Sequence, residues 1–182
     1  MNNNIRLLFT MDKKDYDPES PRFIRPSARA IIQNGERIAM VHSRKYDYYK
    51  FPGGGIEAGE TAEQALIREV REEAGLIVIP ESIVPYGYVR RMQKGQQDNI
   101  FVQDNYYYFC RAEQKQTEQQ LDPYEEEEQF SLEYVCPDHV IAVNRAVRNG
   151  AYRDDRFLLA MAEREAGVLE LLQKEGLCSA GK

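Results

Sequence analysis

The sequence has little cysteine, little histidine and no tryptophan among its 182 residues. Its three cysteines lie far apart and form no C-x-x-C pair, so neither a disulfide framework nor a zinc cluster is indicated. The two histidines, His42 and His139, lack the H-E-x-x-H spacing of zinc hydrolases. We therefore expect free thiols and no zinc chemistry.

Long apolar runs and an excess of positive charge are also absent. No stretch approaches the ~18 apolar residues of a membrane span, and the N-terminal segment does not have the pattern of a signal peptide. Acidic residues outnumber basic ones, 30 to 24, for a formal net charge of −6. A polymeric nucleic acid is therefore not an expected partner. We expect a cytoplasmic protein with no membrane partner.

The length suits a single domain over residues 1–182. Asn34-Gly35 lies between two β-favouring runs and predicts a hairpin, whereas the polar, acidic segment 113–129 predicts a loop. Further strands are predicted at 5–11, 76–79, 83–91, 100–112 and 130–136, with helices at 61–74, 138–149 and 155–175. This order predicts an α/β or α+β sandwich with a mixed sheet in its middle layer.

The helix at 61–74 has the clearest end signals. Thr61 and Gln64 have the spacing of a capping box, and Gly75 is suited to a left-handed C-cap. The same helix places Glu69, Glu72 and Glu73 at i, i+3 and i+4, within one arc of its surface. Three converging carboxylates need a cation, and their hard oxygens favour Mg²⁺, with Mn²⁺ as the alternative. A solvated face paired with arginines is the other interpretation of this cluster.

A glycine-rich loop precedes the acidic helix. Gly53, Gly54 and Gly55 allow the backbone to bend tightly and to approach a phosphate or a metal closely. A loop of this kind leading directly into a triple-carboxylate helix favours a metal and phosphate site over a solvated face. No D-x-[DN]-x-[DN]-G loop occurs, so a calcium site of that type is excluded.

These residues resemble the signature of the Nudix hydrolases, G-x5-E-x7-R-E-U-x-E-E-x-G-U, where U is apolar. Every fixed position of the signature is filled, by Gly54, Glu60, Arg68, Glu69, Val70, Glu72, Glu73, Gly75 and Leu76. The resemblance implies the Nudix-type α/β/α sandwich with a mixed central sheet, over a core of about residues 24–150. The helix at 155–175 carries no motif; packing on its own domain is the default, and a homodimer contact is the alternative.

The resemblance also implies roles for the residues of the signature. Glu72 and Glu73 would be metal ligands, and Glu69 would be a ligand or the base for the attacking water. Arg68 would orient Glu69, with support from Glu60. The carbonyl of Gly53 matches the backbone ligand that often completes such a metal site.

Members of this family often use one more acidic residue from a loop well after the signature. The run "EEEE" before the strand at 130–136 offers candidates, of which Glu128 is the first choice and Glu127 the second. A solvent-facing acidic run is the alternative interpretation of this segment.

Substrate contacts are expected near the glycine loop. Tyr49 belongs to an aromatic run in which a ring could stack on a base, unless it is a core aromatic. Arg29 is a candidate to hold terminal phosphates, as are Arg25, Arg90 and Arg91, although each suits the surface equally well. Gly54 and Gly55 complete the expected substrate-binding set.

The sequence thus predicts an Mg²⁺-dependent pyrophosphohydrolase that cleaves a diphosphate linkage in a small nucleotide-type substrate by water attack at phosphorus. A nucleoside triphosphate and a nucleoside diphosphate linked to another moiety, such as a nucleotide-sugar, remain equal alternatives. A non-catalytic nucleotide-binding sensor or regulator with the same fold is the alternative from another functional class.

Overall fold

The computed structural model describes residues 5–179, and within this range the strands form three sheets. The largest has six strands, in the order β1-β9-β10-β3-β7, and β2 also pairs with β10. Its strands are β1 (Leu7–Asp12), β2 (Arg22–Ile24), β3 (Ser27–Ile31), β7 (Gly53–Gly55), β9 (Val84–Lys94) and β10 (Ile100–Phe109). Because β3 runs parallel to β10 and antiparallel to β7, the sheet is mixed, as the sequence predicts.

Two smaller sheets complete the strand arrangement. One has four strands, and the other consists of a single pair. The four-stranded sheet contains β4 (Gln33–Asn34), β5 (Arg37–Ser43), β6 (Tyr48–Lys50) and β12 (Phe130–Val135), and the pair is β8 (Leu76–Val78) with β11 (Ala112–Gln116). Strand β6 of the four-stranded sheet leads directly into β7, the glycine-rich strand of the large sheet.

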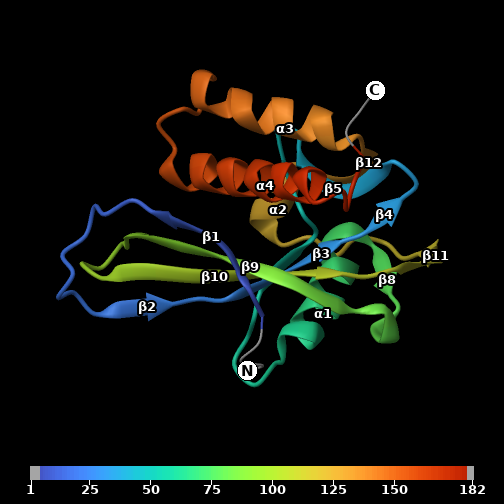
Figure 1. Cartoon of the computed structure of the whole chain (residues 1–182), viewed down its shortest axis with the longest axis horizontal. Coiled ribbons are helices and arrows are strands. Elements are labelled where there is room, and N and C mark those ends of the chain that lie inside the picture. Colours follow the sequence, from blue (N-terminus) through green and yellow to red (C-terminus); the bar gives the residue numbers. More distant parts are fainter. Residues whose placement is uncertain (1–4, 180–182) are drawn as a thin grey trace.

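Helices cover both sides of these sheets (Figure 1). In that view α1 lies below the large sheet, whereas α3 and α4 lie together above it, which is the α/β/α layering expected from the sequence. The helices are α1 (Ala62–Ala74), α2 (Pro123–Glu127), α3 (Pro137–Ala146) and α4 (Arg156–Lys174), with 3₁₀ turns at Pro80–Ser82 and Val147–Asn149. Among the described residues, none of these helices has the length and apolarity needed to cross a membrane.

Each helical layer packs over its own hydrophobic cluster. The cluster under α1 joins Leu66 and Val70 of that helix to residues of β3 and β5, including Ala28 and Val41. The cluster under α3 and α4 joins Leu169 of α4 to residues of the sheets and of α3. The last helix therefore packs on its own sheet, as the default expectation states. The mixed sheet lies between two apolar layers, which is the arrangement that buries both of its faces.

Helix α1 begins and ends at the signals in its sequence. The Thr61 hydroxyl accepts from the Gln64 backbone amide at 3.2 Å, and the Gln64 side-chain oxygen accepts from the Thr61 backbone amide at 2.8 Å. These two bonds complete the capping box. Gly75 ends the helix in the left-handed region, with φ of 65°. The predicted bounds of this helix are confirmed.

Two local predictions are wrong in part. The hairpin at Asn34-Gly35 exists, but Asn34 pairs with Arg37, so its two turn residues are Gly35 and Glu36, and Gly35 alone has the positive φ. The segment 113–129, predicted to be a loop, contains the end of β11 and all of α2. Its polar residues suit an edge strand and a short exposed helix, so composition alone did not reveal either element.

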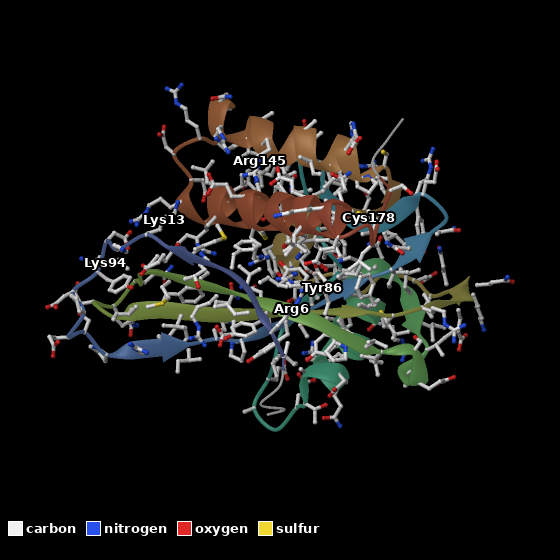
Figure 2. The ribbon with its side chains drawn as sticks, in the orientation of Figure 1. Arg6, Lys13, Tyr86, Lys94, Arg145 and Cys178 are labelled. Carbon is white, nitrogen blue, oxygen red and sulfur yellow. The ribbon has the colours of Figure 1, made fainter. Side chains whose placement is uncertain are left out.

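The strands predicted at 83–91 and 100–112 correspond to β9 and β10, which pair antiparallel with Lys94 opposite Ile100. Arg6, which immediately precedes β1, contacts β9: its guanidinium lies 4.9 Å from the centre of the Tyr86 ring (Figure 2). Arg6 also donates to Glu175 just beyond α4. These contacts fasten the N-terminal segment to both the large sheet and the last helix.

Candidate active site

The glycine-rich strand β7 and helix α1 approach each other closely at one point. A Cβ atom on Gly54 would collide with the carboxylate of Glu69 on α1. Gly53 has a φ of 133°, which side chains rarely adopt, and a Cβ there would collide with the Ala28 carbonyl. Glycine is therefore required at Gly53, where backbone atoms block a side chain, whereas a side chain at Gly54 would push the Glu69 carboxylate aside. The missing side chains bring this backbone within reach of the helix carboxylates.

Arg68 is the centre of the hydrogen-bond network on this side of α1. Its guanidinium donates to both oxygens of Glu60, at 2.7 and 2.9 Å, and to the Gly55 carbonyl at 3.1 Å. It also donates to Glu69 at 2.8 Å and to Glu72 at 3.2 Å. Bonds to Arg68 hold the pKa of the Glu60 carboxyl at about 2, so Glu60 is charged at neutral pH. The Arg68 guanidinium thus connects three of the predicted site glutamates to the glycine loop.

Glu73 lies on the buried side of the same helix. It is only 1% exposed and forms an ion pair with Lys50 of β6. Its other oxygen accepts the Gly53 amide at 3.0 Å. Burial raises the pKa of Glu73, whereas the neighbouring Lys50 charge opposes that rise. Lys50 was not among the predicted site residues, and its place between aromatic residues immediately before the glycine loop is the sequence signal that could have identified it.

The Gly53 carbonyl, the predicted backbone ligand, faces another cation. The Arg29 guanidinium of β3 donates to this carbonyl and, at 3.4 Å, to the Phe51 carbonyl. Arg29 is buried, and its Nε atom has no hydrogen-bond partner in the described part of the chain. The structure thus places Arg29 beside the glycine loop, and its contact with substrate stays a prediction.

Helix α2 supplies the acidic residues that face the helix carboxylates. A cleft of about 490 Å³ is lined by Glu69, Glu72 and Glu73 from α1 and by Asp122 and Glu125 from the start of α2. Glu125 is buried, and its carboxylate accepts the Asp122 amide at 2.9 Å and the Tyr124 hydroxyl at 2.8 Å. The pattern D-P-Y-E, a helix-start signal with proline at the first turn, could have revealed both α2 and Glu125.

Glu128 lies elsewhere, although it was the first choice for the downstream acid. It follows α2, and its carboxylate accepts the hydroxyls of Ser43 and Tyr48, each at 3.0 Å. It does not line the cleft that holds the α1 glutamates. Glu127 forms a surface ion pair with Lys45. Glu125 lies in the first turn of α2, where its carboxylate bonds back to the Asp122 amide, whereas Glu128 is the residue just after the helix. A sequence interpretation that treats the segment as a loop cannot assign the directions of these side chains.

Tyr49 is also placed away from the cleft. Its ring stacks on His42 with centroids 4.3 Å apart, and its hydroxyl donates to Glu133 at 3.1 Å. Successive side chains of a strand point to opposite faces, so Lys50 points toward Glu73 while Tyr49 joins the core under α3. The expectation that Tyr49 contacts substrate is therefore corrected to a core role. Gly54 and Gly55 do line the cleft.

The donor set of the cleft fits a hard divalent cation in its chemistry. Carboxylates from α1 and α2 and the backbone of the glycine loop present only oxygen ligands. Within residues 5–179, however, no three acidic, histidine or cysteine side chains converge as a ready metal cage. Arg68 instead bonds to the partly exposed Glu69 and Glu72, and Lys50 pairs with Glu73, whose buried charge must be compensated.

Comparisons with known proteins agree with this geometry. The family model described as the NUDIX domain matches residues 23–159. The chain is 40% identical over 68 residues to the RNA pyrophosphohydrolase of Halorhodospira halophila, covering 37% of this chain and 36% of the relative. It is 35% identical over 57 residues to the ADP-ribose pyrophosphatase of Methanocaldococcus jannaschii, covering 30% and 34%. The chain thus spans about a third of the length of these curated relatives.

A solved structure has the same fold. The NUDIX hydrolase from Nitrosomonas europaea superposes with a TM-score of 0.54 at 16% identity, over 80% of this chain and 90% of that one. At this level of identity the likeness supports the architecture of the sheet and helices, and the chemistry rests on the residues of the cleft.

Proposed function

The chain belongs to the NUDIX domain family, and we propose that it hydrolyses a phosphoanhydride bond in a nucleotide-type substrate. The observation that carries this proposal is the network around Arg68, which gathers Glu60, Glu69 and Glu72 beside the glycine loop. Two curated relatives are named for the cleavage of a pyrophosphate linkage, one in RNA and one in ADP-ribose. A diphosphate linkage is the feature common to both names.

The proposed cofactor is Mg²⁺, with Mn²⁺ as the alternative. Glu69, Glu72 and Glu73 would hold it together with the Gly53 carbonyl, since these groups provide hard oxygen ligands. When bound, the ion would neutralise the oxygens of the anhydride and lower the pKa of the attacking water. Lys50 now pairs with Glu73 and Arg29 donates to the Gly53 carbonyl, so these two cations would compete with the ion for the same oxygens.

The residues of this chain supply orientation and proton transfer. Arg68 fixes the direction of the Glu69 carboxylate, and Glu60 fixes Arg68 in turn. Glu69 would either help to hold the ion or act as the base, which accepts the proton that water loses as its oxygen bonds to phosphorus. The bond between phosphorus and the bridging oxygen then breaks, and the bridging oxygen leaves with the electron pair on the second phosphate.

We assign the downstream acid to Glu125. It is the buried carboxylate of α2 that lines the cleft, opposite the α1 glutamates. A carboxylate in this place can add a ligand or take up the proton of the attacking water. Glu128, held by Ser43 and Tyr48, is better suited to fixing the end of α2 against β5 and β6.

The test is a hydrolysis screen with and without Mg²⁺, following phosphate and pyrophosphate release. The substrates are nucleoside triphosphates, ADP-sugars and dinucleoside polyphosphates. We expect metal-dependent turnover that falls at least a hundredfold in Glu69→Gln, because the change removes charge at nearly constant volume. Glu63→Gln, on an exposed part of the same helix, is the matched control and should retain turnover. Binding of these compounds without turnover would instead favour a sensor.

A further inference from the structure

A second recess borders the cleft and has the opposite charge. This basic cavity, of about 430 Å³, lies between the β9–β10 hairpin, the start of α4 and the segment around Arg25. Arg25 lines both the cleft and the basic cavity. The other three cations in its wall are Arg29, Arg91 and Arg164, and among the described residues no carboxylate lines it. In a chain of net charge −6, such a concentration of arginine needs an explanation.

Three of the four arginines in this wall, Arg29, Arg91 and Arg164, are buried and incompletely paired, whereas Arg25 is exposed. Arg91 is 5% exposed, and its guanidinium donates to the amide oxygen of Gln93 at 2.7 and 3.0 Å. It forms no ion pair with any carboxylate of the described chain, and burial lowers its pKa to about 10. Arg164, 1% exposed, pairs with Glu165 and bonds to Asn105, but its Nε atom has no partner within residues 5–179.

Buried guanidinium groups of this kind favour an anionic ligand. Taking a charge out of water is energetically unfavourable unless an opposite charge compensates it. Arg29 repeats the pattern, since it bonds only to carbonyls and its Nε atom is also unpartnered among the described residues. Arg29 and Arg164, each with an unpartnered Nε atom, thus line the same cavity as Arg91, which has no ion-pair partner among the described residues.

Aromatic rings share the wall with these cations. The Arg91 guanidinium lies 5.6 Å from the centre of the Phe101 ring and 5.1 Å from that of Phe157. Phe23 is 51% exposed and Phe157 is 46% exposed, although large apolar side chains are usually buried. Exposed rings beside arginines provide surfaces on which a planar heterocycle stacks. The basic cavity therefore presents an anion site next to a stacking surface.

We propose that the basic cavity binds a phosphate ester carried by the ribose of the substrate, separate from the diphosphate that is cleaved. The attached base would stack on Phe23 or Phe157, and the phosphate would accept from Arg91, Arg164 and Arg29. This inference rests on the proposed function, which assigns the diphosphate to the acidic cleft. The ribose phosphate could be a terminal monoester or the diester that joins a second nucleotide, since both present the same anionic oxygens.

The test compares isomers that carry equal numbers of phosphates. Binding of adenosine 3′,5′-bisphosphate and of adenosine 5′-diphosphate is measured by calorimetry with EDTA present, so that neither metal nor turnover contributes. We expect the bisphosphate to bind about tenfold more tightly, because its second phosphate reaches the buried arginines. Equal or tighter binding of the 5′-diphosphate would show that the cavity holds the diphosphate chain and would overturn the inference.

Two neighbouring arginines provide the matched variants. Arg91→Gln should abolish the preference for the bisphosphate. Arg90→Gln should keep it, because Arg90 pairs with Asp104 through bonds of 2.7 and 2.8 Å and does not line the basic cavity. Equal preferences in both variants would contradict the assignment. The dinucleotide pApA distinguishes the two kinds of ribose phosphate. Tighter binding than the bisphosphate indicates that the cavity holds a diester, and weaker binding indicates that it holds a terminal monoester.

A second pair of variants tests the proposal even where Arg91→Gln does not fold. Gln103→Glu places a carboxylate in the cavity wall and should reduce bisphosphate affinity about tenfold by neutralising the arginines. Gln116→Glu adds the same charge on exposed β11 and should leave the affinity unchanged. Equal affinities would overturn the inference. Because these assays exclude turnover, an inactive protein that still prefers the bisphosphate would refute only the hydrolase proposal.

Discussion

The guanidinium of Arg68 donates to both oxygens of Glu60 across eight residues of sequence, at 2.7 and 2.9 Å. Glu60 lies at the entry to α1, and Arg68 lies two turns further along the helix. The bond therefore ties the end of the glycine-rich segment to the part of the helix that carries Glu69 and Glu72. Stability of this segment and orientation of the candidate ligands depend on the same ion pair.

Glu60→Gln should destabilise the protein by about 1–3 kcal/mol at pH 7, because a charge-assisted pair is replaced by weaker bonds. The folded-state pKa of Glu60, about 2, lies below the ordinary 4.5. Its stabilising contribution is therefore complete above pH 4.5 and is lost as the pH falls toward 2. Thermal denaturation of wild type and variant should show a difference at pH 7 that shrinks by pH 2.5. A difference that is constant over this range would contradict the assignment.

Gly54→Ala should reduce hydrolysis at least a hundredfold. The added methyl group would collide with the Glu69 carboxylate and displace it from its bond to Arg68. Gly150→Ala is the control, because a Cβ at Gly150 meets only ordinary contacts. Steady-state kinetics with circular dichroism as a folding check would measure the effect. Normal turnover in a folded Gly54→Ala variant would show that the position of Glu69 does not matter for the reaction.

Lys50→Met should destabilise the metal-free protein by about 3–5 kcal/mol, since it leaves the buried Glu73 carboxylate without its charge partner. Lys45→Met removes only surface contacts, an ion pair with Glu127 and a cation–π contact with the Tyr46 ring, and should cost little stability. Added Mg²⁺ should raise the melting temperature of Lys50→Met more than that of wild type, because the ion no longer competes with an ammonium group. Equal Mg²⁺ shifts in both proteins would argue against Glu73 as a ligand.

Glu125→Gln and Glu128→Gln distinguish the two candidates for the downstream acid. We expect turnover to fall about 10- to 100-fold in Glu125→Gln, whose carboxylate lines the cleft. Glu128→Gln should keep near-normal turnover and lose stability through its bonds to Ser43 and Tyr48. Initial rates at saturating substrate and melting temperatures would be measured for both variants. The reverse pattern of rates would restore Glu128 as the catalytic residue.

Local signals explain which parts of the fold could be predicted. The bounds of α1 follow from Thr61, Gln64 and Gly75, which act within one turn of the helix. The spacing of the signature likewise places Glu69 and Glu72 beside Arg68, because a helix fixes the relative positions of its own residues. Glu60 lies just before the helix cap, so its pairing with Arg68 does not follow from helix geometry.

The contacts that could not be predicted join distant segments. Lys50 meets Glu73 across the packing of β6 on α1, and Arg91 meets Phe157 across the packing of β9 on α4. No pattern within either segment encodes its partner. Glu125 was missed for a different reason, since its segment was treated as a loop and the direction of its side chain depends on the short helix α2.

The two peptide groups that flank Gly53 face opposite charges: its amide faces Glu73, and its carbonyl faces Arg29. A dication drawn to that carbonyl oxygen would release the Arg29 guanidinium, which also borders the basic cavity. Uptake of the ion and uptake of an anion by the cavity should therefore favour each other. Because the dication and the anion would each strengthen the binding of the other through this short backbone segment, the order in which they are added should change the rate of binding but not the final affinity.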